Sequence, residues 1–353
     1  MEILSLRLNQ ITDEFKSRYD KGVYHASALY REVYKFGRTN LFEAKEFKNS
    51  PVFAKQLKNK IKVTPGQVIE IIKDGSLTKF ITRLADNLRI ESVIIPMTNH
   101  QTLCVSSQVG CRMGCRFCQT AKMGFKRNLE VYEIIGQLFN ARFVLKADIK
   151  NIVFMGMGEP FDNFETIIQA IRIMNEQKGF NIGLKHITVS TAGVNKRIDQ
   201  LGKLNMPGIR LAISINSVDE IQRSCLMPVN KTNSLKDLKQ VLLKFPLSKR
   251  DCFLFEYILI KGLNDSIKDA IDLAEYIKPL PVRLNLIPYN RICGFDYESP
   301  NDKEIRYFAD ILNDNGIFVI TRWSKGRSVS AGCGQLGRPN TDSDMTTKGH
   351  RTS

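Results

Sequence analysis

The chain has 353 residues, of which 43% are hydrophobic and 25% charged, an ordinary composition for a folded globular protein. Its 52 lysines and arginines outnumber its 36 acidic residues and give a formal net charge of +16, which favours a polyanionic partner such as nucleic acid. No stretch approaches the ~18 uncharged apolar residues of a spanning helix, and the first residues lack the apolar core of a signal peptide, so we expect a cytoplasmic protein without membrane contact.

Residues 1–90 are predicted to form a separate module. Apolar residues recur at helical spacing in 27–36 and in 50–61. Segments 68–76 and 78–96 then alternate apolar and polar residues around turn sequences, which indicates a β-hairpin. We therefore expect a small helical accessory domain followed by a β-hairpin segment. Four lysines crowd the end of the second helical run: Lys55, Lys58, Lys60 and Lys62.

From Gln101 onward, short apolar strands alternate with amphipathic helices, which indicates a parallel sheet with helices outside. Six such units favour an α/β fold that is a partial (β/α)6 barrel over residues 91–337. The tail, 338–353, has no apolar pattern and is predicted to be disordered. Strands are expected at 103–107, 151–157, 186–192, 209–215, 252–260 and 282–288, with a closing strand at 317–322. Helices are expected near 130–145, 163–177, 195–204, 234–245, 267–278 and 302–314.

Three of the eight cysteines fall within eight residues, which favours metal binding over a disulfide scaffold. Cys111, Cys115 and Cys118 follow the strand at 103–107 with C-x-x-x-C-x-x-C spacing. Thiolates at these offsets can hold three corners of a cubane iron–sulfur cluster and leave the fourth iron open for a small molecule. Structural zinc, the main alternative, prefers four ligands, and the nearest histidine, His100, precedes the strand.

Five segments carry a resemblance to a known family. They are CVSSQVGCRMGCRFCQTAKMGFKRNL (104–129), FMGMGEP (154–160), ITVSTAGV (187–194), NLIPYN (285–290) and CGQL (333–336). In this order they resemble the RlmN/Cfr family of radical S-adenosylmethionine (SAM) RNA adenine C2/C8 methyltransferases, over about residues 80–337. The resemblance implies a [4Fe–4S] cluster on the three cysteines, two equivalents of SAM per turnover, an external electron donor such as flavodoxin, and a monomer.

The matched motifs also supply candidate SAM contacts at the ends of the parallel strands, where α/β folds place their ligands. Without the resemblance, the glycines and Glu159 would be an ordinary strand exit with a solvated carboxylate. With it, the positions that match the SAM-binding residues of the family are Gly158, Glu159, Ser190, Ser214, Ile215, Asn216 and Asn290.

Four further residues match catalytic positions of the family. Cys333 corresponds to the cysteine that SAM methylates, and Cys104 to the cysteine that later releases the RNA–protein adduct by forming a disulfide. The scheme suits adenine, because its electrophilic C2 cannot accept a methyl group directly from electrophilic SAM; a radical formed from S-methyl-Cys333 adds to the ring instead. Met155 matches a methionine beside the reactive cysteine, and Glu91 a proton acceptor. From residue type alone, Cys104 and Cys333 would more often be buried core cysteines, and Met155 suits a strand core nearly as well.

The branch and the RNA target follow from the same comparison. Pro160 and Pro288 resemble the RlmN branch, whose members methylate C2 of an adenosine in 23S rRNA and, in many cases, in tRNA. The lysines of the N-terminal module, with Arg38, would then hold RNA phosphates. Two features indicate a divergent member: Asn216 stands where both branches usually carry His, and the segment before Cys333 lacks the usual acidic residues.

Three alternatives remain at this point. The same machinery could place the methyl group at C8, as in Cfr-type antibiotic resistance. A radical SAM activating enzyme would act on a protein, and an RNA-binding protein could hold a purely structural cluster. Neither of the last two needs a pair of outlying cysteines, so Cys104 and Cys333 favour an RNA (adenine-C2-)-methyltransferase.

Overall fold

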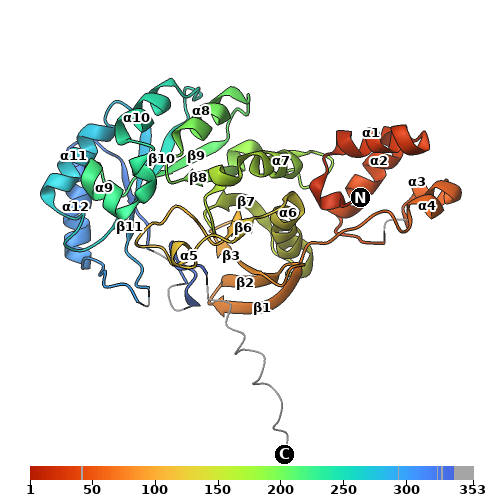
Figure 1. Ribbon diagram of the computed structural model, residues 1–353, viewed down its shortest axis with the longest axis horizontal. Helices are drawn as coiled ribbons and strands as arrows, with labels where there is room; N and C mark the ends of the chain where they lie inside the picture. Colours follow the sequence, from red (N-terminus) through yellow and green to blue (C-terminus); the bar gives the residue numbers. More distant parts are fainter. Residues whose placement is uncertain (41–42, 293, 324, 327–328, 338–353) are drawn as a thin grey trace, which may run out of the picture.

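The computed structural model describes residues 1–40, 43–292, 294–323, 325–326 and 329–337. At the N-terminus, helices α1 (Leu8–Tyr19), α2 (Val23–Tyr30), α3 (Lys45–Lys48) and α4 (Pro51–Leu57) form a group beside the main body of the molecule (Figure 1). Edge-to-face aromatic contacts hold the group together, and the rings of Phe15 and Phe53 are 5.2 Å apart. The sequence analysis anticipated α2 and α4 but not α1.

The main body is one ten-stranded mixed sheet, in the order β1-β2-β3-β4-β7-β8-β9-β10-β11-β12. Strands β1, β2 and β3 pair antiparallel to one another, and β3 pairs antiparallel with β4, the first barrel strand. From β4 onward, neighbouring strands are parallel. The antiparallel strands are β1 (Gln67–Asp74), β2 (Leu77–Arg83) and β3 (Arg89–Pro96). The parallel strands are β4 (Gln101–Cys104), β7 (Ile149–Phe154), β8 (Ile187–Thr191), β9 (Arg210–Ser214), β10 (Phe253–Leu259), β11 (Val282–Pro288) and β12 (Val319–Thr321).

This sheet confirms the expected α/β class, because all six barrel strands are present and the short β12 adds a seventh parallel strand. Strand β3 crosses residue 90, at which the sequence analysis divided the N-terminal module from the barrel. The division into domains stays a prediction, and the tail 338–353 lies outside the described residues. Among the described residues, every helix is too short or too polar to cross a membrane.

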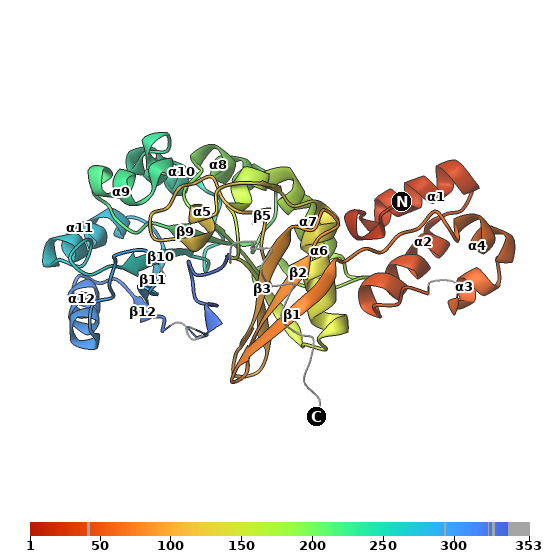
Figure 2. The same ribbon diagram turned by 60° about the horizontal axis from the view of Figure 1, so that its bottom comes forward.

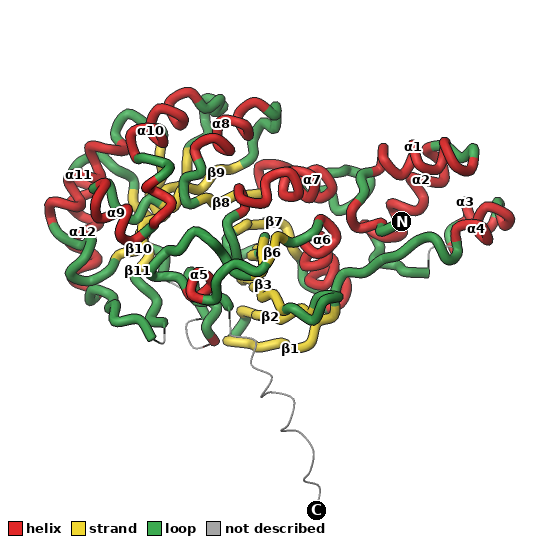
Figure 3. The backbone as a smooth tube through the Cα atoms, in the orientation of Figure 1, coloured by secondary structure: helices red, strands yellow, loops and turns green. Residues whose placement is uncertain are grey.

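Helices cover the outer face of the curved parallel strands (Figures 1 and 3). Their starts agree with local sequence signals: Ser266 caps the amide of Asp269, and Asn301 caps that of Glu304. Helix α9 was not anticipated. The outer helices are α6 (Val131–Phe139), α7 (Phe164–Asn175), α8 (Asn195–Lys203), α9 (Glu220–Leu226), α10 (Leu235–Lys244), α11 (Ile267–Ile277) and α12 (Asp302–Asp314), and a two-stranded sheet of β5 (Gln108–Val109) and β6 (Arg127–Asn128) flanks the short α5 (Gln119–Lys122).

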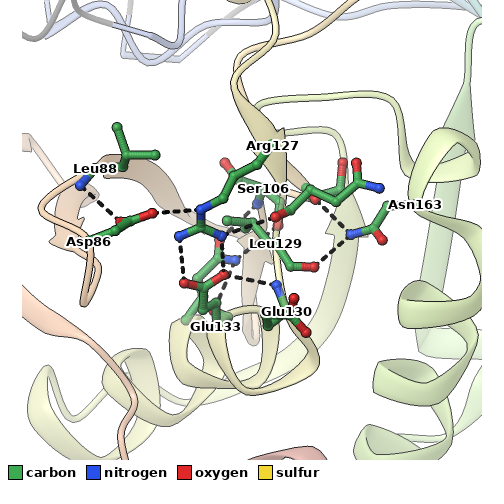
Figure 4. A network of polar contacts seen from close by, with 11 residues as sticks. Asp86, Leu88, Ser106, Arg127, Leu129, Glu130, Glu133 and Asn163 are labelled. Atoms are coloured by element: carbon green, nitrogen blue, oxygen red, sulfur yellow. Dashed lines mark hydrogen bonds and ion pairs between the residues drawn. The ribbon is translucent and has the colours of Figure 1, made fainter.

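Arg127 joins three separate parts of the chain (Figure 4). Its guanidinium forms a bidentate pair with Glu133 at the start of α6, at 2.7 and 2.8 Å, and contacts Asp86 of the β2–β3 turn at 2.6 Å. Glu133 is almost fully buried, so its charge depends on this partner. The contact fixes the segment that follows the three clustered cysteines against the antiparallel strands.

We expect Arg127→Met to lower the free energy of unfolding by about 3 kcal/mol, because Glu133 would keep a buried charge without its partner. Anaerobic urea unfolding followed by circular dichroism measures this loss. Arg197→Met is the matched control, since Arg197 pairs at 3.2 Å with the exposed Glu165 and such pairs contribute about 1 kcal/mol at most. Equal losses in the two variants would contradict the role given to Arg127.

Candidate active site

The three clustered cysteines lie in the loop between β5 and α5, at the carboxyl end of the first parallel strand. All three line one cavity, which we call the loop cavity; it leaves about 920 Å³ of space, part of it open to solvent. Phe117 is buried beside Cys118 in an apolar cluster with Leu226 and Met227. This apolar surround shields one side of any group that the thiols hold.

The thiols suit a polynuclear cluster better than a single ion. Burial raises the pKa of Cys111 to about 12 and also raises the pKa of Cys115 and Cys118, so a bound metal would have to displace three protons. The three thiols share one cavity, and thiolates at these spacings can hold three corners of a cubane cluster.

Strand ends supply the rest of the loop cavity. Of the SAM-contact positions expected from the sequence, it is lined by Gly158, Glu159, Ser190, Ser214 and Asn216, and of the catalytic positions by Met155 and Cys333. It is not lined by Ile215, which is fully buried, or by Asn290, whose amide donates to the carbonyl of Cys333 at 3.0 Å.

Gly158 and Glu159 form a tight connection between β7 and its helix. Gly158 has a φ of +100°, and a Cβ there would lie 2.5 Å from the Cβ of Gln108, so only glycine fits. The carboxylate of Glu159 accepts hydrogen bonds from the amides of Phe161 at 3.0 Å and Ala192 at 2.8 Å. Burial raises its pKa to about 7 against the effect of these bonds. Each oxygen keeps a lone pair, so the group can still receive a cationic ligand.

Asn216 ends β9 in a left-handed conformation, with a φ of +55° that asparagine tolerates better than most residues. Its side-chain oxygen accepts from the amide of Ile258 at 2.8 Å, and its nitrogen contacts the sulfur of Met227. A hydrogen bond from Asn216 to SAM, which the sequence led us to expect as a contact, would therefore have to share these groups. Asn216, which stands where the family usually has His, thus joins the ends of β9 and β10.

Cys333 lies on a segment that docks onto the cysteine loop. The carbonyl of Gly334 accepts from the amide of Gln119 at 2.7 Å, and that of Leu336 from the hydroxyl of Thr120 at 2.6 Å. Cys333 is accessible to solvent, yet desolvation by the surrounding walls raises its pKa to about 11; the charge of Glu256 adds to the shift and Arg322 opposes it. The segment thus brings the sulfur of residue 333 into the loop cavity.

A second cavity, which we call the edge cavity, is lined by residues of β2, β3, β4 and β7 to β12. It spans from β2 and β3 to the residues after β12, and it leaves about 1690 Å³ including its open mouth. Cys104 lines this cavity and not the first. The two cavities share four residues of their walls: Met155, Ile287, Cys333 and Leu336.

Strand periodicity explains why two cavities meet here. Alternate side chains of a strand point to the same face of the sheet. On β8, Thr188 lines the edge cavity and Ser190 the loop cavity; on β10, Leu254 and Glu256 divide in the same way. Burial raises the pKa of Cys104 to about 12, and the presence of Cys333 adds to the rise.

Glu91 lines neither cavity, and its Oε2 pairs with Lys79 at 3.3 Å. Sequence reasoning missed Glu256, a buried acid of the loop cavity that accepts from Asn285 at 2.8 Å and lies 4.0 Å from Arg322. The sequence does contain a signal for Glu256, because a single acid interrupts the apolar strand FLFEYILI.

Comparisons with known proteins agree with this geometry. A model of the radical SAM superfamily matches residues 105–274. The crystal structure of a radical SAM methyltransferase from Sphaerobacter thermophilus superposes with a TM-score of 0.88 at 31% identity, covering 95% of this chain and 99% of that one. The fold and the cysteine loop therefore define a radical SAM enzyme, whose cofactors are a [4Fe–4S] cluster and SAM.

Proteins with similar sequences identify the family within this class. The dual-specificity RNA methyltransferase RlmN of Desulfotalea psychrophila is 42% identical over 291 residues, covering 80% of this chain and 78% of the relative. The enzyme of the same name from a Nitratiruptor species is 36% identical over 356 residues, covering 95% of this chain and 97% of the relative. The chain belongs to the RlmN family of radical SAM methyltransferases, as the sequence motifs indicated.

Gly158→Ala should distort the loop cavity, because the added methyl group meets the Cβ of Gln108 and the positive φ strains the backbone. We expect SAM affinity to fall at least about tenfold, measured by calorimetry on the reconstituted protein. Gly262→Ala is the control: its φ is +69°, but a Cβ there meets nothing within 4 Å. Unchanged SAM binding by Gly158→Ala would contradict the tight fit.

Glu256→Gln should change the pH dependence of stability. Burial raises the pKa of Glu256 to about 7 from its ordinary 4.5. The stabilisation from the protonated folded form is present below the unfolded pKa and disappears as the pH rises through about 7. Wild type should therefore lose up to about 3 kcal/mol relative to Glu256→Gln between about pH 5 and pH 8, measured by urea unfolding. Parallel curves for the two proteins would refute the shift; Glu275→Gln, exposed on α11, controls for the lost charge.

Proposed function

We propose that this protein methylates C2 of an adenosine in 23S rRNA, and in tRNA, through an S-methylcysteine intermediate on Cys333. The observation that supports this most directly is the position of Cys333 in the wall between two cavities. A sulfur in that position can take a methyl group from a ligand on one side and present it to a second ligand on the other.

The loop cavity suits SAM. Two buried acids, Glu159 and Glu256, lie in its wall and can balance the ammonium and sulfonium charges of SAM. The serines of β8 and β9, Ser190 and Ser214, offer hydroxyls for its carboxylate and ribose, and Cys111, Cys115 and Cys118 hold the cluster. When bound, the cluster supplies the electron with which SAM is cleaved.

The family resemblance implies the chemistry of the two outlying cysteines. The Cys333 thiolate would attack the methyl carbon of SAM, which breaks the bond between that carbon and the sulfonium sulfur and releases S-adenosylhomocysteine; a nearby sulfonium charge would favour the thiolate. Two SAM molecules would serve one turnover, the first for the methyl group and the second at the cluster. Cys104 would then attack the sulfur of Cys333 and form a disulfide; the bond from that sulfur to the methylene carbon breaks, and its electron pair takes up a proton to give the methyl group of the released base. Glu91 is the proposed proton acceptor, and its Oε2 pairs with Lys79 at 3.3 Å.

The remaining assignments rest on the family. An external donor such as flavodoxin would deliver the electron, rRNA and tRNA substrates imply a cytoplasmic enzyme, and we propose a monomer. Exposed Lys55, Lys58, Lys60 and Lys62 can contact RNA phosphates, whereas Arg38 pairs with Glu32 at 2.9 Å.

The test is an anaerobic assay of the reconstituted protein with methyl-labelled SAM, a reductant, and rRNA and tRNA, read by mass spectrometry. We expect 2-methyladenosine from wild type and at least an about 1000-fold loss in Cys333→Ala. Cys104→Ala should accumulate a covalent RNA–protein adduct, because no thiol releases the product. Cys252→Ala, a half-buried cysteine that lines neither cavity, is the control.

Two other results have clear meanings. Formation of 8-methyladenosine would assign the protein to the Cfr type with the same mechanism. If SAM is cleaved while Cys333 is never methylated and no RNA is labelled, the proposal is wrong and a protein substrate has to be sought.

A further inference from the structure

The two cavities that meet at Cys333 carry opposite charges. The described residues that line the loop cavity include Glu159 and Glu256 and no lysine or arginine. Those that line the edge cavity include Arg210, Arg322 and Lys325 and neither aspartate nor glutamate. Coulomb interactions of this sign favour a cationic ligand in the first cavity and a polyanion in the second.

The cations of the edge cavity surround its mouth. Arg210 begins β9, and Arg322 and Lys325 follow β12. Lys325 donates to the carbonyl of Pro96 at 3.0 Å and so reaches across to the antiparallel edge of the sheet; Figure 2 shows β12 and β3 facing each other. Neither Arg210 nor Lys325 forms an ion pair within the described part of the chain. Their charges therefore remain available to an anionic ligand.

An aromatic ring lies among these charges. Trp323, the single tryptophan of the sequence, lines the edge cavity and is 47% exposed. An exposed tryptophan is uncommon on a surface that only meets water, and it offers a platform on which a nucleobase can stack. The same cavity is also lined by Cys104, Met155 and Cys333.

We propose that the edge cavity is the entry site for a single-stranded RNA segment whose target nucleotide is turned out toward Cys333. Arg210 and Lys325 contact the flanking phosphates, and the ring of Trp323 stacks on a neighbouring base. This inference rests on the proposed function and adds to it the side of the barrel from which the RNA enters. It also explains why Cys104, which releases the product, lines this cavity alone: the adduct forms on this side.

In this arrangement, the residues that bind the RNA differ from the residues that react with it. Phosphate contacts supply binding energy that depends on salt, and stacking tolerates any base, so neither selects a sequence. An extruded base reaches the sulfur only after it leaves its helical stack, which favours an unpaired or loop nucleotide. The site is therefore suited to an RNA loop rather than to a continuous duplex.

The experiment measures binding and methylation separately on the reconstituted holoenzyme. A dye-labelled, adenosine-containing single-stranded RNA is titrated and followed by anisotropy, and the fluorescence of the single tryptophan is recorded in parallel. We expect tryptophan quenching that saturates together with the anisotropy. Trp323→Ala should weaken binding about tenfold, and Trp323→Phe should bind nearly as wild type without the quenching signal.

Arg210→Gln and Lys325→Gln should each weaken binding and reduce the slope of log affinity against log salt by about 1. Arg197→Gln and Lys268→Gln, on the outer helices α8 and α11, are matched controls and should leave that slope unchanged. An equal effect of the inner and outer variants would overturn the inference, because the charges would then act only through the net charge.

The two proposals can fail separately. If wild type makes 2-methyladenosine while tryptophan fluorescence is flat and Trp323→Ala and Arg210→Gln bind normally, the RNA enters elsewhere and the inference is overturned. If RNA quenches Trp323 and the variants weaken binding but no methyladenosine forms, the nucleotide site stands and the proposed reaction fails.

Discussion

The rim of the barrel depends on one buried guanidinium. Arg223 is fully buried, and it donates to the carbonyls of Ala192 at 2.8 Å, Ser214 at 3.2 Å and Ile215 at 3.0 Å, and to the side chain of Asn230 at 2.6 Å. A charge in this position is tolerable only while these oxygens surround it. Since three of them end β8 and β9, the guanidinium fixes the two strand ends that line the loop cavity.

The same rim determines where the reactive sulfur lies. The segment around Cys333 has little core of its own, and it is held by hydrogen bonds to residues on either side of the opening: Gln119 and Thr120 after the cysteine loop, and Asn290 after β11. Backbone contacts dominate this docking, so it depends on the position of the two loops more than on side-chain identity. A shift of either loop would move the sulfur out of the wall between the cavities.

The sequence predicted the sheet well because strand and helix periods depend on neighbouring residues alone. It also predicted which loop carries the cysteines, since three thiols within eight residues are a local signal. It did not identify Arg223, which in EIQRSCL looks like a residue of an exposed helix; only packing against β8 and β9 buries it. The ion pair of Glu91 could not be predicted from the sequence either, because Lys79 comes from a neighbouring strand and the register of β2 and β3 has to be known first. The edge cavity has no local signature, because its lining residues come from many strands that are far apart in the sequence.

The departures from the family pattern can now be related to the two cavities. Asn216 serves the loop cavity, where its left-handed backbone and its contacts with Ile258 and Met227 preserve the strand end, so the SAM side is maintained with a different residue. The segment before Cys333 lacks the acidic residues that the family usually has there. In this segment, the carbonyl of Ser330 accepts a hydrogen bond from Lys79. No described residue that lines the edge cavity is acidic. Removal of negative charge beside a site for a polyanion strengthens its attraction. In the proposed reaction, the divergence would therefore alter how RNA is held and leave the chemistry at the sulfur unchanged.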